Sequence, residues 1–339
     1  MNITLVGIDV AKTVFQLCCA NEHGKIIARK RLQRAQLLQK ISQILPCTIV
    51  MEACGSANYW AREFEQLGHT VKLIAPQYVK PFVKGNKNDY RDAEAIVEAA
   101  QRPHMRFVTH KTVEQQDLQS LLRIREMYVT MRTRATNQLR GLLAEYGHAI
   151  PQGLATLRKV LPKLYDREVI NGLSVQLKAL LEQQYNTLLQ LDQEIAVCDN
   201  KLKAFVKKDD RCERLMEIPG IGVISAAALV ALVGTGAGFK NGRHFAAYLG
   251  LVPKQHSSGN TQKLLGISKR GDEFARRMLI HGARSVVIRS KNKPSIRSTW
   301  VERLRNEKGI NRACVALANK NARIAMAILL SGERYQEAA

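Results

Sequence analysis

The chain has 339 residues, of which 46% are hydrophobic, so we expect two or three folded domains. Its 52 Lys and Arg against 29 Asp and Glu give a formal net charge of +23, which favours a polyanion as partner. The apolar runs fall short of the roughly 18 residues of a membrane span, and the N-terminus lacks the basic region of a signal peptide. The seven cysteines include no C-x-x-C pair, which argues against a zinc site or a disulfide framework. We therefore expect a cytoplasmic protein with no membrane partner, whose cysteines are buried as small hydrophobic side chains.

Residues 1–105 have the pattern of an α/β domain. Apolar runs predict strands at residues 3–10, 13–20, 25–30, 48–51 and 70–74, with a turn at residues 21–24. Helical periodicity predicts helices at residues 35–45, 56–67 and 90–101, the first ended by Pro46 and the second by Gly68. A sheet that opens with a hairpin and has helices packed on it fits an RNase H-like architecture.

Residues 106–210 predict a second, almost wholly helical region. Within it, apolar residues recur at alternating steps of four and three, which is the a/d seam of a coiled coil interrupted by one polar residue. A seam this narrow favours a partner helix, either the helix predicted at residues 113–146 or the same segment of another subunit. An ordinary core helix is the alternative. The seam comprises Leu177, Leu181, Gln184, Leu188, Leu191, Ile195, Cys198, Leu202 and Phe205.

Residues 211–339 predict a third region, mostly helical, with a polar loop rich in Gly and Ser at residues 253–271. The positive charge is concentrated near this end. Residues 240–339 hold 20 basic and 6 acidic residues, whereas residues 1–105 hold 14 and 9. Because each phosphate that is neutralised by Lys or Arg releases condensed counterions, we expect nucleic acid to bind this basic half.

Four acidic residues are placed where a metal-dependent site could form. Asp9 and Glu52 each end an apolar strand, where a charged side chain must reach the sheet edge or meet a cation. Asp89 and Asp92 lie three residues apart and share one helix face, although an N-cap and a first-turn acid could serve the helix alone. Crowded carboxylates require a counter-charge, and Mg²⁺ prefers oxygen ligands. Two such ions about 4 Å apart can activate an attacking oxygen and stabilise a leaving one in phosphoryl transfer.

The run Ile218-Pro219-Gly220-Ile221-Gly222, followed by an apolar helix, predicts a helix-hairpin-helix. Gly220 and Gly222 allow a tight turn, and their N–H groups at a helix N-terminus can face a DNA phosphate. Such a contact would position DNA without reading its sequence. The alternative is a tight turn between helices that binds no ligand.

The polar loop at residues 253–271 combines serines with glycines and the cations Lys254, Lys269 and Arg270. A nucleophilic serine requires an exposed hydroxyl, a route for its proton, and positive charge beside the phosphoryl oxygens. A loop of this composition can also be merely solvated, so the residues alone leave both interpretations open.

Taken together, these motifs resemble the DEDD transposases of bacterial insertion sequences, which are related to the pilin-gene-inverting recombinases. The resemblance covers nearly the whole chain, and the order of the motifs is itself specific. Tyr90-Arg91, between the two aspartates, is bulkier than the small pairs common in that family. The matching stretches are residues 7–12, 51–56, 87–94, 218–222, 245–253 and 267–271.

The resemblance implies a fold, a set of domains and a catalytic set. Residues 1–105 would form a RuvC-like domain whose Asp9, Glu52, Asp89 and Asp92 bind Mg²⁺ or Mn²⁺. Residues 106–210 would form a helical coiled-coil region, and residues 211–339 a mostly helical transposase domain with a catalytic serine. By its position after Gly-Leu-x-Pro and before a glycine, that serine corresponds to Ser258, with Ser257 and then Ser268 as the other choices.

The resemblance also implies partners. Similar members of the family use a structured guide RNA to choose donor and target DNA, and act as oligomers, here a dimer or a tetramer. The expected function is DNA strand cleavage and exchange through a serine nucleophile. The alternatives are a Holliday-junction-type endonuclease that uses only the carboxylates and forms no covalent intermediate, and a non-catalytic DNA-binding scaffold.

Overall fold

The structure, a computed structural model, describes residues 2–83, 89–164, 173–259, 261–290 and 296–337. The chain forms two compact units, each discontinuous in sequence. The first comprises Met1–Gln115 and Gly236–Lys240, and the second comprises Gln116–Thr235 and Asn241–Ala339.

A mixed β-sheet is the centre of the first unit, and in the described part of the chain it has six strands in the order β3-β2-β1-β4-β5-β6. The first three strands form an antiparallel meander, and the next two run parallel to β1. The last strand, antiparallel to β5, was not predicted, because two residues are too few to show alternation. The strands are β1 (Leu5–Asp9), β2 (Val14–Ala20), β3 (Ile26–Gln33), β4 (Thr48–Glu52), β5 (Thr70–Ile74) and β6 (Phe107–Val108).

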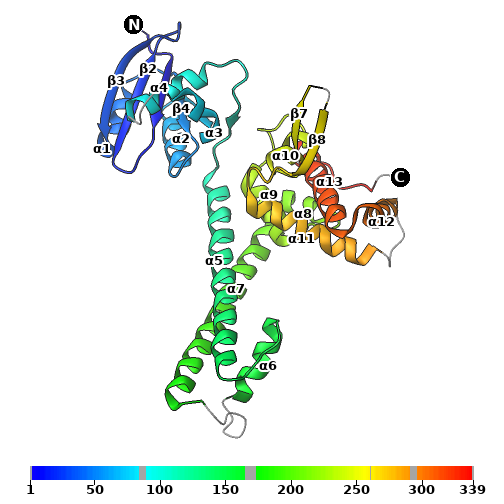
Figure 1. Ribbon diagram of the computed structural model, residues 1–339. Coiled ribbons are helices and arrows are strands. Elements are labelled where there is room, and N and C mark those ends of the chain that lie inside the picture. The colour runs from blue at the N-terminus through cyan, green and yellow to red at the C-terminus, as the bar shows by residue number, and fades with distance from the viewer. Residues whose placement is uncertain (1, 84–88, 165–172, 260, 291–295, 338–339) are drawn as a thin grey trace. The chain divides into compact units, whose positions relative to one another are not determined.

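Helices cover both faces of this sheet, as Figure 1 shows. On one face, α1 (Arg34–Ser42) and α2 (Ala57–Gln66) pack on alternate strand residues, and Phe15 meets Trp60 edge to face at 5.2 Å between ring centroids. The other face carries α4 (Asp89–Ala100), with the short α3 (Pro76–Val79) and a 3₁₀ turn before it. Every strand and helix predicted in residues 1–105 is present, with ends shifted by a few residues.

The packing of α4 on the sheet is unusually close at Gly7 in the middle of β1. A Cβ atom built on Gly7 would lie 2.6 Å from Val97 Cγ2 and 2.8 Å from the carbonyl oxygen of Ala93. Because Gly7 and Asp9 are two residues apart on one strand, they face the same side of the sheet. The side chain of Asp9 is therefore directed towards α4.

Two long helices, α5 (Val113–Glu145) and α7 (Val175–Lys208), run side by side in the second unit, with α6 (Leu154–Leu164) between them in sequence (Figure 1). Arg125 Nε donates to Asp199 Oδ1 at 2.6 Å, and Arg132 Nη1 donates to Asp192 Oδ1 at 3.0 Å. The later arginine on α5 pairs with the earlier aspartate on α7, so the two helices are antiparallel. The predicted intramolecular partner of the apolar seam is therefore present.

The buried side of α7 follows the predicted seam except at Gln184, which is half-buried, and at the C-terminal end. The expected residue there, Phe205, is only half-buried, and Val206 is buried in its place. A straight α-helix has 3.6 residues per turn, so a strict repeat of 3.5 drifts off the buried face over several turns. The buried residues are Leu177, Leu181, Leu188, Leu191, Ile195, Cys198, Leu202 and Val206.

The rest of the second unit is mostly helical, as predicted: α8, α10, α11 and α12 pack on α13, and α9 packs on α7, α8 and α11. In the described residues, α13 alone is long and apolar enough to cross a membrane, which the sequence analysis overlooked. Because 56% of its apolar window is buried inside the protein, α13 is the central core helix of this unit. The helices are α8 (Asp210–Met216), α9 (Val223–Val233), α10 (Gly242–Tyr248), α11 (Glu273–Arg289), α12 (Ile296–Lys308) and α13 (Ile310–Ser331).

The segment expected to be a polar loop contains a β-hairpin, and this corrects the prediction. Strands β7 (Pro253–Ser258) and β8 (Thr261–Ile267) pair antiparallel, with Ser258 opposite Thr261. Gly259 turns the chain with a φ of +54°, a conformation that favours glycine. A Gly-Asn pair between two short runs is a recognised hairpin signal, and here it outweighs the polar composition.

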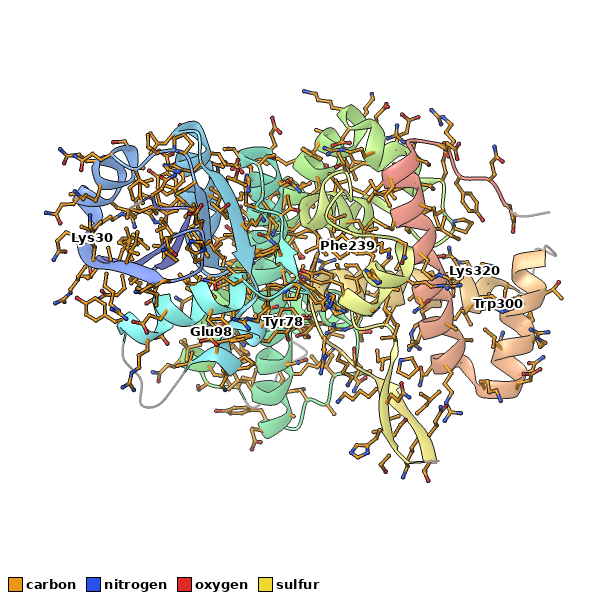
Figure 2. All side chains as sticks on the ribbon, turned by 90° about the horizontal axis from the view of Figure 1, so that it is seen from above. Lys30, Tyr78, Glu98, Phe239, Trp300 and Lys320 are labelled. Atoms are coloured by element: carbon orange, nitrogen blue, oxygen red, sulfur yellow. The ribbon has the colours of Figure 1, made fainter. Side chains whose placement is uncertain are left out.

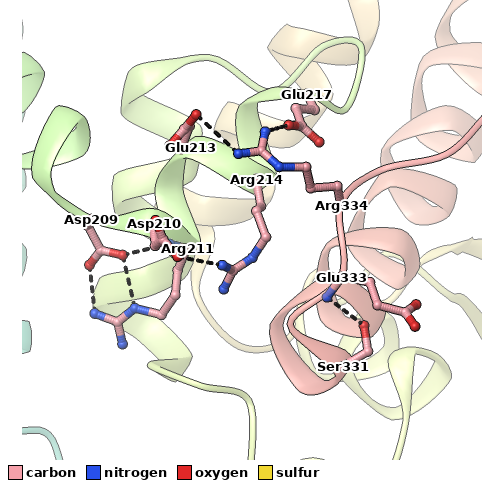
Figure 3. A network of polar contacts seen from close by, with 9 residues as sticks. All are labelled: Asp209, Asp210, Arg211, Glu213, Arg214, Glu217, Ser331, Glu333 and Arg334. Atoms are coloured by element: carbon pink, nitrogen blue, oxygen red, sulfur yellow. Dashed lines mark hydrogen bonds and ion pairs between the residues drawn. The ribbon is translucent and has the colours of Figure 1, made fainter.

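The chain after α13 is held against α8 (Figure 3). Arg334 forms ion pairs with Glu213, at 3.5 Å, and with Glu217. The backbone N–H of Tyr335 donates to Glu217 Oε2 at 3.0 Å. The C-terminal segment is thus fixed to the body of its own unit.

The cysteines only partly match the prediction of burial. All seven are free, and Cys18, Cys19, Cys198, Cys212 and Cys314 are buried. Cys47 is half-buried and Cys54 is exposed, so for these two the prediction was wrong. Cys54 follows Glu52 at the end of a strand, where the chain leaves the sheet core.

Candidate functional site

Asp9 and Glu52 end two neighbouring parallel strands. Ile8 pairs with Met51, so the next residue along each strand is one of the two acids. Adjacent strands lie about 4.8 Å apart, which brings both carboxylates to one sheet edge. Both acids are half-buried. Burial raises the pKa of the Cys54 thiol, and the negative charges of Glu52 and Asp9 raise it further, so both acids lie near Cys54.

Helix α4 brings Asp92 to the same place. Glu52 lies two residues after Val50, whose side chain packs with α4 residues, so Glu52 faces the helix. The first turns of α4 carry Asp92, which is half-buried. Asp89 is the first residue of α4, and its side chain lies outside the described residues. Of the four predicted acids, Asp9 and Glu52 thus share a sheet edge, and Asp92 lies near Glu52.

Burial raises the pKa of Glu52, and the nearby negative charge of Asp92 raises it further. Glu52 and Asp92 are therefore close enough for their negative charges to repel each other.

The side chains at this edge differ in how well they suit a divalent cation. In the described part of the chain, no three His, Cys, Asp or Glu side chains are close enough together to hold a metal ion. Beside the acids, however, Gln16 pairs with Asp9 across β1 and β2, and its side-chain oxygen is buried without a hydrogen-bond partner. Carboxylate and amide oxygens are hard ligands of the kind that Mg²⁺ prefers. The residue types therefore fit a divalent cation, which would also relieve the repulsion at Glu52, and sequence reasoning missed Gln16.

The predicted glycine motif forms the connection between α8 and α9. Gly220 has a φ of +95° and packs on α11, where its carbonyl oxygen would lie 1.8 Å from a Cβ built on Gly282. The buried Asn321 donates to the carbonyl oxygen of Pro219 at 3.0 Å. Packing therefore explains Gly220. Gly222 precedes the first residue of α9, with open space around the position of a Cβ.

The hairpin separates the three candidate serines. Cross-strand pairing places His256 opposite Lys263 and Ser258 opposite Thr261, and by alternation these four residues share one face. Ser257 lies on the other face and accepts a hydrogen bond from Gln255 Nε2 at 2.8 Å. The hydroxyl of Ser268 is buried. The exposed Ser258 is therefore the serine that shares its face with a histidine and a lysine.

The base of the hairpin is fixed by a buried arginine that the sequence did not reveal. Arg276 of α11 is 7% exposed, and its Nη1 donates to the carbonyl oxygens of Leu249 at 3.0 Å and Arg270 at 2.7 Å. These two carbonyls belong to the chain before and after the hairpin. Gly271, with a φ of +69°, packs directly on the carbonyl of Tyr248. The Lys269-Arg270 pair is thereby held at the base, with Lys254 exposed on β7.

Comparison with known families gives a consistent result. A transposase family model of the DEDD, IS110 type matches residues 6–148, which include all four acids. The model described as "Transposase IS116/IS110/IS902 family" matches residues 212–300, which include the glycine turn and the hairpin. The mixed sheet with its surrounding helices is consistent with a RuvC-like DEDD domain, so the class is that of DNA transposases and recombinases.

Individual relatives agree along nearly the whole chain. The transposase for insertion sequence element IS1111A of Coxiella burnetii is 47% identical over 335 residues, which is 99% of this chain and 92% of the relative. A probable family 20 transposase of Pseudomonas aeruginosa is 48% identical over 330 residues, or 97% of each chain. A pilin gene-inverting protein of Moraxella bovis is 23% identical over 300 residues, or 79% of each. The chain belongs to the IS110/IS116 family of transposases.

Family membership confirms an enzyme that acts on DNA, and sets aside the non-catalytic scaffold. The DEDD domain also suggests a divalent metal, although it does not identify which one.

Proposed function

We propose that this transposase cleaves and exchanges DNA strands through Ser258. In the cleavage step, Ser258 Oγ forms a bond to phosphorus while the bond from phosphorus to a deoxyribose oxygen breaks, and that oxygen leaves with a proton. The hydroxyl of a second strand then attacks the phosphoserine and releases the serine, so the number of phosphodiester bonds is conserved. The observation that carries this proposal is the exposed Ser258 on a hairpin face shared with His256 and Lys263.

We assign Asp9, Glu52, Asp89 and Asp92 to the binding of Mg²⁺ or Mn²⁺. Once bound, the ion would supply positive charge to the phosphoryl oxygens. The support is the shared sheet edge of Asp9 and Glu52 and the effect of Asp92 on the pKa of Glu52.

Contacts to the DNA backbone are assigned to the basic second unit. Lys254, Lys269 and Arg270 are exposed in or beside the hairpin, where they can neutralise phosphates. Gly220 and Gly222 form the turn of a helix-hairpin-helix, and the open surroundings of Gly222 at the start of α9 leave room for a phosphate.

The wider organisation is part of the proposal. We retain three domains at residues 1–105, 106–210 and 211–339, with the α5 and α7 pair as a coiled coil. We also retain a homo-oligomer, a dimer or tetramer, that works in the cytoplasm with a structured guide RNA. Exposed Ile124, Met127 and Met131 recur along α5 at helical spacing, which supports a further helix partner.

The test is strand exchange by Ser258→Ala with Ser257→Ala as the matched control. We expect Ser258→Ala to abolish exchange and the protein–DNA adduct while DNA binding persists, and Ser257→Ala to remain active. The junction-type endonuclease is the second candidate, because the carboxylate edge is the better supported of the two sites. The endonuclease hypothesis predicts cleaved DNA ends that carry no protein, and a Ser258→Ala protein that still cleaves DNA. An adduct that persists in Ser258→Ala would refute the assignment of this serine.

A further inference from the structure

A groove of about 1230 Å³ lies in the second unit between the base of the hairpin and helices α10, α12 and α13. Pro253 and residues 265–267 of the hairpin form one wall, and Trp300 of α12 forms part of another. The floor is a face of α13. The volume of the groove exceeds the roughly 300–1,000 Å³ of ordinary small-molecule pockets. The groove therefore has room for an extended ligand.

We propose that this groove binds an unpaired segment of the DNA substrate, which is the strand that becomes single when DNA is opened for exchange. This inference rests on the proposed function, since it names the form of DNA that the serine hairpin handles. It concerns a different set of residues from the serine and the carboxylates.

The charge of the groove matches a nucleic-acid backbone. Four cations line it, Arg243, Arg312, Lys320 and Arg323, and all four are exposed. None of the described residues that line the groove is acidic. A strand placed here would release counterions at each neutralised phosphate.

The floor favours unpaired bases over a duplex. Helix α13 buries one face in the core and turns a second face, made of two i, i+4 rows, towards the groove. One row alternates Arg312 and Lys320 with the apolar Ala316 and Ile324. The other places the apolar Val315 between two asparagines, followed by Arg323. A duplex keeps its bases stacked inside and presents phosphates, which gain nothing from an apolar floor. A single strand can lay bases on the floor and phosphates along the cationic rim.

Trp300 offers a ring on which a base can stack. It is half-buried, and Lys320 Nζ lies 4.9 Å from the centroid of its ring (Figure 2). Lysine has a flexible four-carbon stem, so Lys320 can leave the ring for a neighbouring phosphate when a base takes its place. Aromatic rings beside cations in a groove are the usual combination in single-strand binding.

The chain's own C-terminal segment does not fill the groove. Arg334 and Tyr335 are held by Glu217, which directly follows α8 and is not among the residues that line the groove. The exposed cations also disfavour an apolar helix as occupant, because its binding would bury them without partners.

The experiment measures binding by the full chain in EDTA, where no cleavage is expected. The protein is titrated into three labelled ligands, and binding is followed by fluorescence anisotropy. The ligands are an oligothymidylate of about 12 nucleotides, a DNA duplex of the same length and the matching RNA. We expect Trp300→Ala and Arg323→Ala each to weaken single-stranded DNA binding about tenfold and duplex binding less than about twofold. Arg303→Ala, an exposed arginine of α12 outside the groove, is the matched control and should change neither.

Tryptophan fluorescence provides a second measurement that does not depend on affinity. Trp60 is 2% exposed, so quenching by single-stranded DNA should come from Trp300 and vanish in Trp300→Phe. Equal losses for duplex and single strand, a loss confined to RNA, or quenching that survives Trp300→Phe would each overturn the proposal.

Repeating the titration with Ser258→Ala separates this inference from the proposed function. Unchanged single-strand binding by a Ser258→Ala protein that still exchanges strands would remove the role of Ser258 and leave the groove standing. The opposite result would be strand exchange that depends on Ser258, with normal single-strand binding by the Trp300→Ala and Arg323→Ala proteins. That result would keep the role of Ser258 and remove the groove.

Discussion

The carboxylate edge and the serine hairpin are built in opposite ways. Asp9, Glu52 and Asp92 extend from two central strands and a helix that packs on them so closely that Gly7 has no space for a side chain. Ser258 lies near the tip of a two-stranded hairpin whose first strand is exposed along its whole length. The carboxylates and the serine, which would act in one reaction, are thus held by the surrounding structure to very different degrees.

The difference has a physical basis. A buried charge needs a rigid surround that fixes its partners, whereas an isolated two-stranded hairpin is only marginally stable in water. The hairpin is fixed at its base, where Arg276 joins the two arms. Beyond that base, the residues of both strands are exposed up to the turn. Under the proposed function, the geometry of the carboxylate edge would be set by folding, whereas the position of Ser258 would be completed by DNA.

The largest effect on the rate of strand exchange should follow from Glu52→Gln. If the carboxylate edge holds the ion that assists phosphoryl transfer, losing this ligand should cost several kcal/mol of transition-state stabilisation. At about 1.4 kcal/mol per tenfold change in rate, strand exchange should fall by about a hundredfold to a thousandfold. The measurement is exchange of labelled DNA by purified protein.

Glu63→Gln is the matched control, because Glu63 lies in the same unit, on α2, away from the sheet edge. It should leave exchange unchanged. If Glu52→Gln kept full activity, the carboxylate edge would have no catalytic part, and the comparison of two cooperating regions would fail.

Much of the carboxylate edge could be predicted from sequence, and little of the hairpin. Asp9 and Glu52 follow apolar runs, so strand ends and a shared edge were readable from local pattern alone. Gln16 and Arg276 were not, because the importance of Gln16 depends on its cross-strand pairing with Asp9 and that of Arg276 on two backbone carbonyls distant in sequence. The proposed role of Ser258 rests on the family resemblance, through its position after Gly-Leu-x-Pro and before a glycine, since its polar surroundings resemble those of any solvated segment.

A smaller effect is expected on the free energy of unfolding when a glycine in each region is replaced by alanine. Gly7→Ala places a Cβ 2.8 Å from the backbone oxygen of Ala93, so α4 must move. Overpacking of this kind costs about 1–3 kcal/mol. Gly266 of β8 has no atom within 4 Å of its Cβ position, so Gly266→Ala should change the free energy of unfolding by less than about 0.5 kcal/mol.

Urea unfolding followed by circular dichroism measures both variants, with wild type alongside. Because α4 carries Asp92, Gly7→Ala should also reduce strand exchange. Equal stabilities of the two variants would show that the close packing of α4 on β1 is not a constraint, and would remove the rigid support that we assign to the carboxylate edge.

The smallest effect is a pH dependence that arises from crowding at Glu52. Burial and the charge of Asp92 raise its pKa in the folded chain, so the folded state binds this proton more tightly than the unfolded state does. Stability from this group is therefore present below the ordinary glutamate pKa of about 4.3 and is lost as the pH rises through the raised value. In EDTA, the free energy of unfolding of wild type should fall relative to Glu52→Gln over this window, and added Mg²⁺ should restore it. A difference between the two proteins that stays constant with pH, or that Mg²⁺ does not change, would mean that the acids are too far apart to share an ion.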